Sequence, residues 1–228
     1  TNTITGVPNG LQLVERANVF ITDAFKYGWF EVQDGASQMV AQYLDPKPGM
    51  RVIDACAGAG GKSLHMAALM ENKGSILSLD IYPKKLEELK RRARRNGAHN
   101  IETRLIDSNK VIKKLMGKAD RLLIDAPCTG LGVLRRNPGS KWKLSPEFLE
   151  EIIEKQQEIL AAYAPMLKAD GEMVYATCSN LPQENKQQID RFLKTEMGQN
   201  FKIIKEQTLL PSATNFDGFY MALLKRVS

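Results

Sequence analysis

Three cysteines stand where a parallel sheet would bring them together. Cys56 lies in "DACAG", Cys128 in "DAPCTG" and Cys178 in "ATCS", each at or directly after the end of an apolar run typical of a strand. The carboxyl ends of neighbouring parallel strands meet at one edge of a sheet, so we expect the three thiols along one short rim. A thiolate can attack an electrophilic carbon and later leave, which is the chemistry of a nucleophilic catalyst. Taken singly, each cysteine can also be a small buried apolar residue.

Four acidic residues also lie at the ends of expected strands, as the cysteines do. Asp54, Asp80, Asp107 and Asp125 each close an expected strand, which places them on the same rim. An acid at the end of the second strand, as Asp80 is, can accept hydrogen bonds from ribose hydroxyls. A single acid of this kind can instead be a helix cap, but four in register favour a ligand pocket.

The stretch "DACAGAGGKS", residues 54–63 and hereafter the glycine loop, resembles two phosphate-binding patterns without matching either. A Walker loop needs glycine where Cys56 stands, although Gly61, Lys62 and Ser63 fit its end. A dinucleotide fingerprint needs a third glycine at Ser63. What remains is a strand running through small residues into a helix N-terminus, where backbone approaches a polar ligand closely. Together with the acids, this predicts a pocket for an adenosine-type ligand without a triphosphate.

The elements that must position these residues alternate from Met50 onward. Apolar runs predict five strands, and the helical patterns between them predict an α/β fold, a doubly wound and mostly parallel sheet. Two further runs at the end predict an antiparallel hairpin, making seven strands in all. The expected strands are 50–55, 74–80, 101–107, 118–126, 171–178, 201–207 and 217–226, and the expected helices are 62–70, 83–97, 145–168 and 182–197.

The first 47 residues are less regular. We predict a small β-plus-helix cap over residues 1–47, with a helix starting near Ser37, and a main domain over residues 48–228. The chain opens without an initiator methionine, which is typical of a fragment and leaves room for an upstream domain. We expect a monomer.

Composition narrows the function classes. A cysteine count of 3 without a C-x-x-C pair argues against a disulfide scaffold and a zinc site, and we expect no metal. The absence of a long apolar run or a signal-peptide pattern predicts a cytoplasmic protein that does not contact membranes. The net charge of +6 permits a nucleic-acid partner. Trp142 lies among the cations of "LRRNPGSKWK", a pattern that suits base stacking and phosphate contacts or, alternatively, an anchored loop.

Several of these motifs resemble one family across about residues 10–226. The stretches "DAPCTGLGVLRRNP", "KWK", "LKADGEMVYATCSNLPQEN" and "DGFYMALLKR", with the glycine loop, are similar to the Sun (Fmu, RsmB-like) family of RNA cytosine-5 methyltransferases. The resemblance implies a Rossmann-like methyltransferase fold, S-adenosylmethionine (SAM) as cofactor and RNA as partner, with 16S ribosomal RNA favoured and transfer RNA possible. One departure is Ala59, where the family usually has a proline that stiffens the turn, so we expect cofactor binding to be retained.

The resemblance also implies roles for individual residues. Cys178 would attack C6 of cytosine, and Cys128 would help to resolve the covalent adduct. Asp125 and Lys62 would hold the edge of the base, where a hydrogen bond offsets the charge that gathers on the ring. The implied cofactor contacts are Cys56, Ala57, Gly58, Ala59, Gly60, Gly61, Lys62, Asp80 on the ribose, Asp107 near the adenine and Asp125 near the methionine end.

Three alternatives remain at this point. Methylation of a base amino group usually goes with an aromatic residue where "DAPC" has Cys128. A nucleotide triphosphatase would need the glycine that Cys56 replaces and an acid for magnesium. An RNA-binding module without catalysis would not need both cysteines and Lys62.

Overall fold

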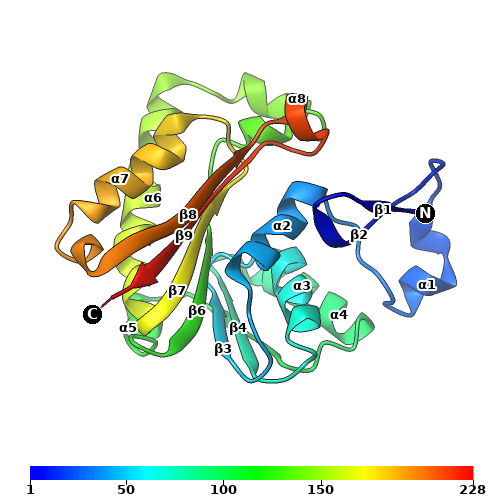
Figure 1. Ribbon diagram of the computed structural model, residues 1–228, viewed down its shortest axis with the longest axis horizontal. Helices are drawn as coiled ribbons and strands as arrows, with labels where there is room; N and C mark the ends of the chain where they lie inside the picture. The colour runs from blue at the N-terminus through cyan, green and yellow to red at the C-terminus, as the bar shows by residue number, and fades with distance from the viewer. Residues whose placement is uncertain (228) are drawn as a thin grey trace.

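A seven-stranded sheet forms the centre of the computed structural model, which describes residues 1–227 (Figure 1). The strand order is β5-β4-β3-β6-β7-β9-β8. Neighbours from β5 to β7 are parallel, whereas β9 pairs antiparallel with both β7 and β8. The strands are β3 (Arg51–Asp54), β4 (Ser75–Asp80), β5 (Ile101–Leu105), β6 (Ala119–Asp125), β7 (Leu167–Thr177), β8 (Phe201–Leu209) and β9 (Phe219–Arg226). This architecture confirms the predicted fold class.

The order of strands creates a switch point at β3. The chain builds outward from β3 through β4 to β5 and then crosses back to place β6 on the other side of β3. The carboxyl ends of β3, β6 and β7 are therefore adjacent, with Asp54 beside Leu123 and Asp125 beside Ala176. Ligands of open α/β sheets bind at such a point. The strands that precede Cys56, Cys128 and Cys178 are thus neighbours, as the expected common rim of the three thiols requires.

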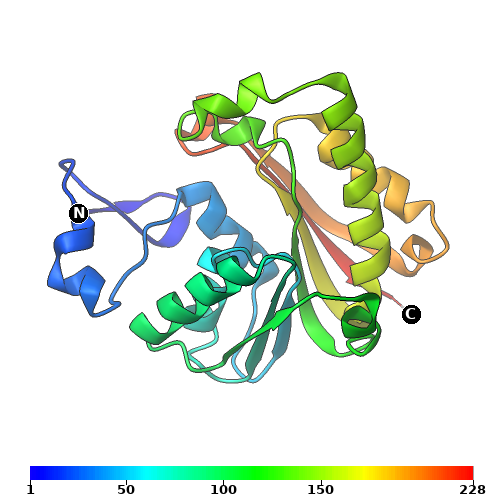
Figure 2. The same ribbon diagram turned by 180° about the vertical axis from the view of Figure 1, so that it is seen from behind.

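Helices cover both faces of the sheet, as Figures 1 and 2 show from opposite sides. Successive strand residues point to opposite faces, so Ile53 packs with one layer and Val52 with the other. The layer around Ile53 contains α5 (Asn109–Lys113), α6 (Pro146–Tyr163) and α7 (Lys186–Leu193); the other layer contains α2 (Gly35–Leu44), α3 (Gly61–Leu69) and α4 (Pro83–Arg95).

The N-terminal segment holds a small two-stranded sheet of β1 (Asn2–Ile4) and β2 (Val7–Gln12), followed by α1 (Asp23–Lys26). These elements lie away from the β8 edge of the main sheet (Figure 1). The helix α2 begins at Gly35, with Asp34 as its N-cap, and buries Val40 and Leu44 in the core of the main sheet. The division of the chain at residue 47 stays a prediction.

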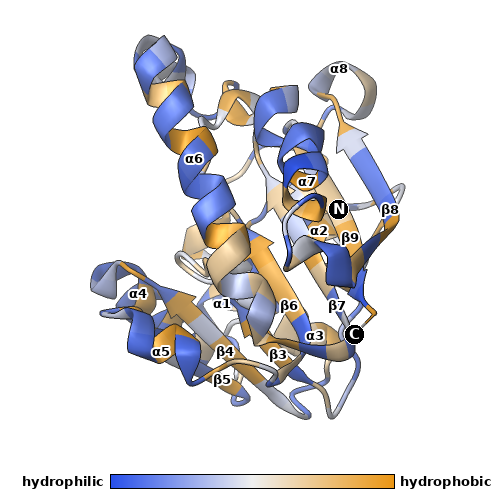
Figure 3. Cartoon of the chain, turned by 90° about the vertical axis from the view of Figure 1, so that its left-hand side faces the viewer, coloured by the Kyte–Doolittle hydropathy of each residue, from blue (hydrophilic) through white to orange (hydrophobic). Residues whose placement is uncertain are grey.

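Some boundaries differ from those that the sequence predicts. The strand β7 starts at Leu167, inside the stretch expected to be helical, because α6 ends at Tyr163. The helix α5 has only five residues, too few for a periodic apolar pattern to show. The strand β8 is an edge strand whose middle is exposed and polar (Figure 3), as expected for an edge that must not pair with another chain.

Within residues 1–227, no helix has both the length and the apolar character needed to cross a membrane.

Candidate active site

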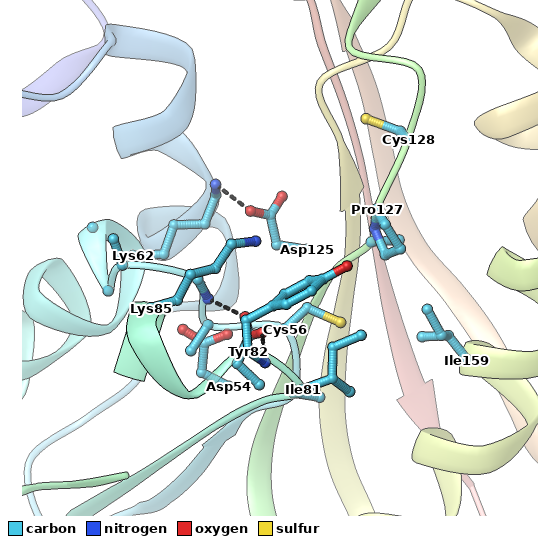
Figure 4. A pocket seen from close by; sticks show the side chains of 18 of the residues that line it. Asp54, Cys56, Lys62, Ile81, Tyr82, Lys85, Asp125, Pro127, Cys128 and Ile159 are labelled. Atoms are coloured by element: carbon cyan, nitrogen blue, oxygen red, sulfur yellow. Dashed lines mark hydrogen bonds and ion pairs between the residues drawn. The ribbon is translucent and has the colours of Figure 1, made fainter. Parts of the chain in front are cut away.

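A cavity of about 1040 Å³ opens at the switch point (Figure 4). Its walls come from the glycine loop, from the ends of β4, β6 and β7, from α6 and from the residues just before α2. The predicted site residues that line it are Asp54, Cys56, Ala57, Gly58, Ala59, Gly60, Gly61, Lys62, Asp80, Asp125, Cys128 and Cys178. The structure therefore brings almost every predicted site residue to one space.

The glycine loop depends on backbone conformations that favour glycine. Gly58 has φ of +55° and Gly60 has φ of +87°. A Cβ on Gly60 would also lie 2.4 Å from the Leu89 side chain, so only glycine fits against α4. From that helix, Arg92 donates a hydrogen bond of 2.7 Å to the carbonyl oxygen of Ala59. The backbone is thus held open toward the cavity.

Glu31 in turn holds Arg92. Its carboxylate pairs with Arg92 at 3.0 Å and with Arg95, and it accepts a hydrogen bond of 2.6 Å from Asn96. Burial works to raise the pKa of Glu31, but the hydrogen bonds from Arg92 and Asn96 hold it below its ordinary value. Sequence reasoning did not single out this cluster.

Two buried carboxylates shape the floor of the cavity. Asp80 accepts hydrogen bonds from the backbone N–H groups of Gly58 and Tyr82, both at 2.8 Å. Asp54 accepts a bond of 2.6 Å from the Ser63 hydroxyl through Oδ2. Its Oδ1 is buried and finds no hydrogen-bond partner among residues 1–227. Burial is the main cause that raises the pKa of Asp54 to about 7.

Lys62 and Asp125 form an ion pair over the cavity (Figure 4). The Lys62 Nζ atom lies 2.6 Å from Asp125 Oδ2, and the lysine side chain is 12% exposed. Burial alone would lower the pKa of Lys62, but the charge and hydrogen bond of Asp125 raise it above its ordinary value. Lys62 therefore stays cationic beside the cysteines.

Cys128 and Cys178 face one another from adjacent loops. Their Sγ atoms are 3.4 Å apart, and both cysteines are free thiols. The hydrogen bond with Cys128 is the main cause that lowers the pKa of Cys178; burial and then the Asp125 charge act against it, and the Lys62 charge lowers it further. The same hydrogen bond, followed by burial, raises the pKa of Cys128 well above its ordinary value. These opposite shifts favour Cys178 as the group of the pair that loses its proton first, with Cys128 as the hydrogen-bond donor.

Cys56 has a different character. It lines the same cavity, but burial and then the charge of Asp54 raise its pKa well above the ordinary value. A thiol held in its neutral form is a poor nucleophile. Cys56 therefore contributes shape to the cavity.

Asp107 is the one predicted site residue that the structure does not bring to the cavity. It is exposed and binds the hydroxyl of Ser108 at 2.9 Å, whereas Ile106 and Asn109 on either side of this pair line the cavity. The chain after β5 therefore reaches the cavity, and it is the exposed side chain of Asp107 that stays outside it. The role of Asp107 near an adenine stays a prediction.

The basic loop after β6 stands at the mouth of the site. Arg136 lines the cavity and pairs with Asp217 at 2.5 Å. Trp142 is 81% exposed, and the Lys141 ammonium lies 4.8 Å from the centre of its ring. An exposed indole is available for stacking, so the alternative of a loop anchor loses support.

The sequence of this chain matches known proteins of one family. The family model described as "16S rRNA methyltransferase RsmB/F" matches residues 41–225. A probable ribosomal RNA small subunit methyltransferase B of Synechocystis sp. is 35% identical over 99% of this chain and 54% of its own length. A protein of the same description from Bacillus subtilis is 41% identical over 76% of this chain and 39% of its own length. The chain thus spans about half the length of the curated relatives it matches.

Solved structures agree. The crystal structure of PH0851 superposes with a TM-score of 0.87 at 32% identity, covering 93% of this chain and 50% of the other. NSun6 from Pyrococcus horikoshii, solved with SFG, gives 0.84 at 29% identity, covering 93% and 57%. With its sheet order, paired cysteines and matched sequence, this chain belongs to the RsmB/F family of 16S rRNA methyltransferases.

Proposed function

We propose that this chain transfers a methyl group from SAM to C5 of a cytosine in RNA, with 16S ribosomal RNA as the favoured target. The observation that carries the proposal is the pair of Cys128 and Cys178 sulfurs 3.4 Å apart at the edge of the cavity. Family membership and the descriptions of the relatives support the choice of ribosomal RNA.

The cavity fits SAM. Its buried Asp54 Oδ1 atom lacks a partner among the described residues, which suits the ammonium group of a methionine moiety. A Cβ placed on Gly58 would meet no atom within 4 Å, so the glycine loop leaves open space for a ligand against its backbone. The Asp80 carboxylate accepts two hydrogen bonds and keeps lone pairs for ribose hydroxyls. When bound, SAM supplies an electrophilic methyl group on a sulfonium.

The cysteine pair supports a division of labour. The Cys178 thiolate adds to C6 of cytosine, and the electron pair of the C5–C6 bond becomes available at C5 to take the methyl group. The proton on C5 then leaves to a base, and the electrons of that C–H bond reform C5–C6 as the Cys178 sulfur departs. The Cys128 thiol, close to the same sulfur, can protonate it on departure or shuttle the C5 proton.

Lys62 and Asp125 support the addition step. Negative charge gathers on the pyrimidine ring when the thiolate adds, and a donor at the ring edge disperses it. Lys62, Asp125 and Cys178 line the same cavity, where the Lys62 ammonium favours the Cys178 thiolate and the Asp125 charge opposes it. The target cytosine must be unstacked to enter. Trp142 and the cations around it are suited to hold the flanking RNA.

The test measures transfer of labelled methyl from SAM to 16S ribosomal RNA and to transfer RNA by the protein, Cys178→Ser and Cys128→Ser. Wild-type protein should label cytosine C5, and Cys178→Ser should lose activity. Labelling by Cys178→Ser at the wild-type rate would refute the assignment of the nucleophile. Calorimetry should show binding of SAM and no binding of ATP. Bisulfite sequencing of cellular RNA with and without the gene identifies the target, and labelling of transfer RNA alone would overturn the ribosomal choice.

A further inference from the structure

A buried polar cluster connects the two cysteine loops through hydrogen bonds to the residues beside the cysteines. We call it the loop-bridging cluster. Each of its members is at most 8% exposed, and they are Thr129, Thr177, Ser179, Glu184 and Asn185. Thr129 follows Cys128, while Thr177 and Ser179 flank Cys178.

Glu184 binds the loop that carries Cys128. Its Oε1 accepts a hydrogen bond of 2.7 Å from the backbone N–H of Thr129, and its Oε2 accepts one of 2.6 Å from the Thr129 hydroxyl. Gln156 of α6 donates to the same Oε1 at 3.3 Å and to the carbonyl oxygen of Pro127 at 3.0 Å. Residues on both sides of Cys128 are thereby held.

Asn185 binds the loop that carries Cys178. Its Oδ1 accepts from the Thr177 hydroxyl at 2.5 Å, and its Nδ2 donates to the carbonyl oxygen of Ser179 at 2.9 Å. The hydroxyls of Thr129 and Ser179 lie 3.3 Å apart and join the two halves of the cluster. Two consecutive residues thus each hold one cysteine loop.

We propose that Glu184 and Asn185 are positioning residues that hold the two cysteine loops in register, so that the Cys128 and Cys178 sulfurs meet. The inference rests on the proposed function for its catalytic consequence. It deepens that function, because it explains the sulfur separation of 3.4 Å by two side chains that do not react, the Glu184 carboxylate and the Asn185 amide.

Glu184 acts on Cys128 both by holding its loop in place and through its negative charge. Burying a carboxylate costs free energy unless hydrogen-bond donors satisfy it. Both Glu184 oxygens accept hydrogen bonds, from Thr129 in the Cys128 loop and from Gln156. The pKa of Cys128 is raised chiefly by the hydrogen bond to Cys178 and by burial, and the Glu184 charge adds to this effect. Glu184 therefore also favours the protonated form of Cys128.

The experiment compares Glu184→Ala, Glu184→Gln and Asn185→Ala with Gln183→Ala, an exposed neighbour whose side chain faces solvent. The first readout needs neither RNA nor SAM. It is the rate at which diamide, which takes up two protons and two electrons, converts the two thiols into a disulfide, followed by peptide mapping. The second readout is kcat and KM for RNA methylation, and thermal melting reports folding.

We expect Glu184→Ala and Asn185→Ala to form the Cys128–Cys178 disulfide more slowly. Their kcat should fall by about 10²-fold, the scale for a misplacement of about 1 Å, with KM for RNA unchanged. Glu184→Gln keeps an acceptor for the Thr129 N–H and should restore most of both rates, and Gln183→Ala should match wild type.

Folded Glu184→Ala with wild-type disulfide formation and kcat would overturn the proposal, as would Glu184→Gln impaired as severely as Glu184→Ala. If Glu184→Ala does not fold, Thr129→Val decides, because it removes the hydroxyl contact with Glu184 and keeps the backbone one. A wild-type rate of disulfide formation in Thr129→Val would then refute the positioning role. Failure of the wild-type protein to methylate RNA would refute the proposed function alone, since the disulfide readout does not use RNA.

Discussion

Gly132 offers a sharp test of how tightly the reacting loops are packed. Its N–H donates to the carbonyl oxygen of Cys178 at 2.9 Å, and its own carbonyl accepts from the N–H of Gly218 at 2.8 Å. It therefore joins the loop after β6 to the residue after β7 and to the start of β9. In Gly132→Ala, the added Cβ would lie 2.1 Å from the Gly218 carbonyl oxygen, 1.3 Å short of the 3.4 Å at which ordinary contact begins.

The magnitude follows from this overlap. Overpacking costs about 1 to 3 kcal/mol, and loss of one of the two hydrogen bonds adds about 1 kcal/mol. We therefore expect the free energy of unfolding of Gly132→Ala to fall by about 2 to 4 kcal/mol. The Cβ also presses on the Cys178 carbonyl, at 2.8 Å, so kcat should fall by about 10²-fold while SAM binding is unchanged.

Urea unfolding, calorimetry with SAM and methyl-transfer kinetics measure these effects. Gly139→Ala is the matched control, because its Cβ would meet only Asn137 Oδ1 at 3.9 Å and should change stability by less than about 0.5 kcal/mol. Wild-type stability and activity in Gly132→Ala would show that the loops around Gly132 are not tightly packed and would refute this prediction.

Three other outcomes are expected. Cys128→Ser should accumulate a covalent RNA adduct through Cys178, seen as a retarded band on a denaturing gel; normal turnover without such a band would contradict the division of labour. Asp80→Ala frees the N–H groups of Gly58 and Tyr82 and should weaken SAM binding by about tenfold or more in calorimetry, an expectation that unchanged affinity would rule out. Burial raises the pKa of Asp54 from 3.8 to about 7, so the folded protein holds a proton that the unfolded chain has released between these values. The contribution of Asp54 to the free energy of unfolding is therefore highest below pH 3.8 and falls as the pH rises to about 7, by at most about 4 kcal/mol. Asp54→Asn should therefore gain stability relative to wild type between about pH 4 and about pH 7 in urea titrations, and a pH-independent difference would show that Asp54 is not buried in this way.

The sequence predicts those site residues that lie at the ends of adjacent parallel strands. Strand ends at Asp54, Asp125 and Cys178 were predictable because apolar runs mark strands and parallel topology aligns their carboxyl ends. Asp107 followed the same rule but lies outside the cavity, because the rule places the end of a strand and not the direction of each side chain: Ile106 and Asn109 line the cavity, whereas Asp107 is exposed.

Glu184 shows what local reasoning misses. An acid in the polar stretch "LPQEN" is typical of a surface turn, yet this side chain is fully buried. Its burial depends on Thr129, which is 55 positions away in the chain, so no local pattern carries the signal. The resemblance included this stretch without giving it a role.

The insertion of β9 between β7 and β8 also bears on biosynthesis. Ribosomes deliver β7 and β8 before β9, so β8 has no partner in this sheet until residues 219–226 emerge. Gly218, which closes onto Gly132 beside the thiols, arrives in that same late stretch. A nascent chain that has released everything up to β8 therefore lacks the β9 neighbour of β7 and the contact between Gly218 and Gly132, so the sheet beside the two cysteine loops is complete only after residues 219–226 have emerged.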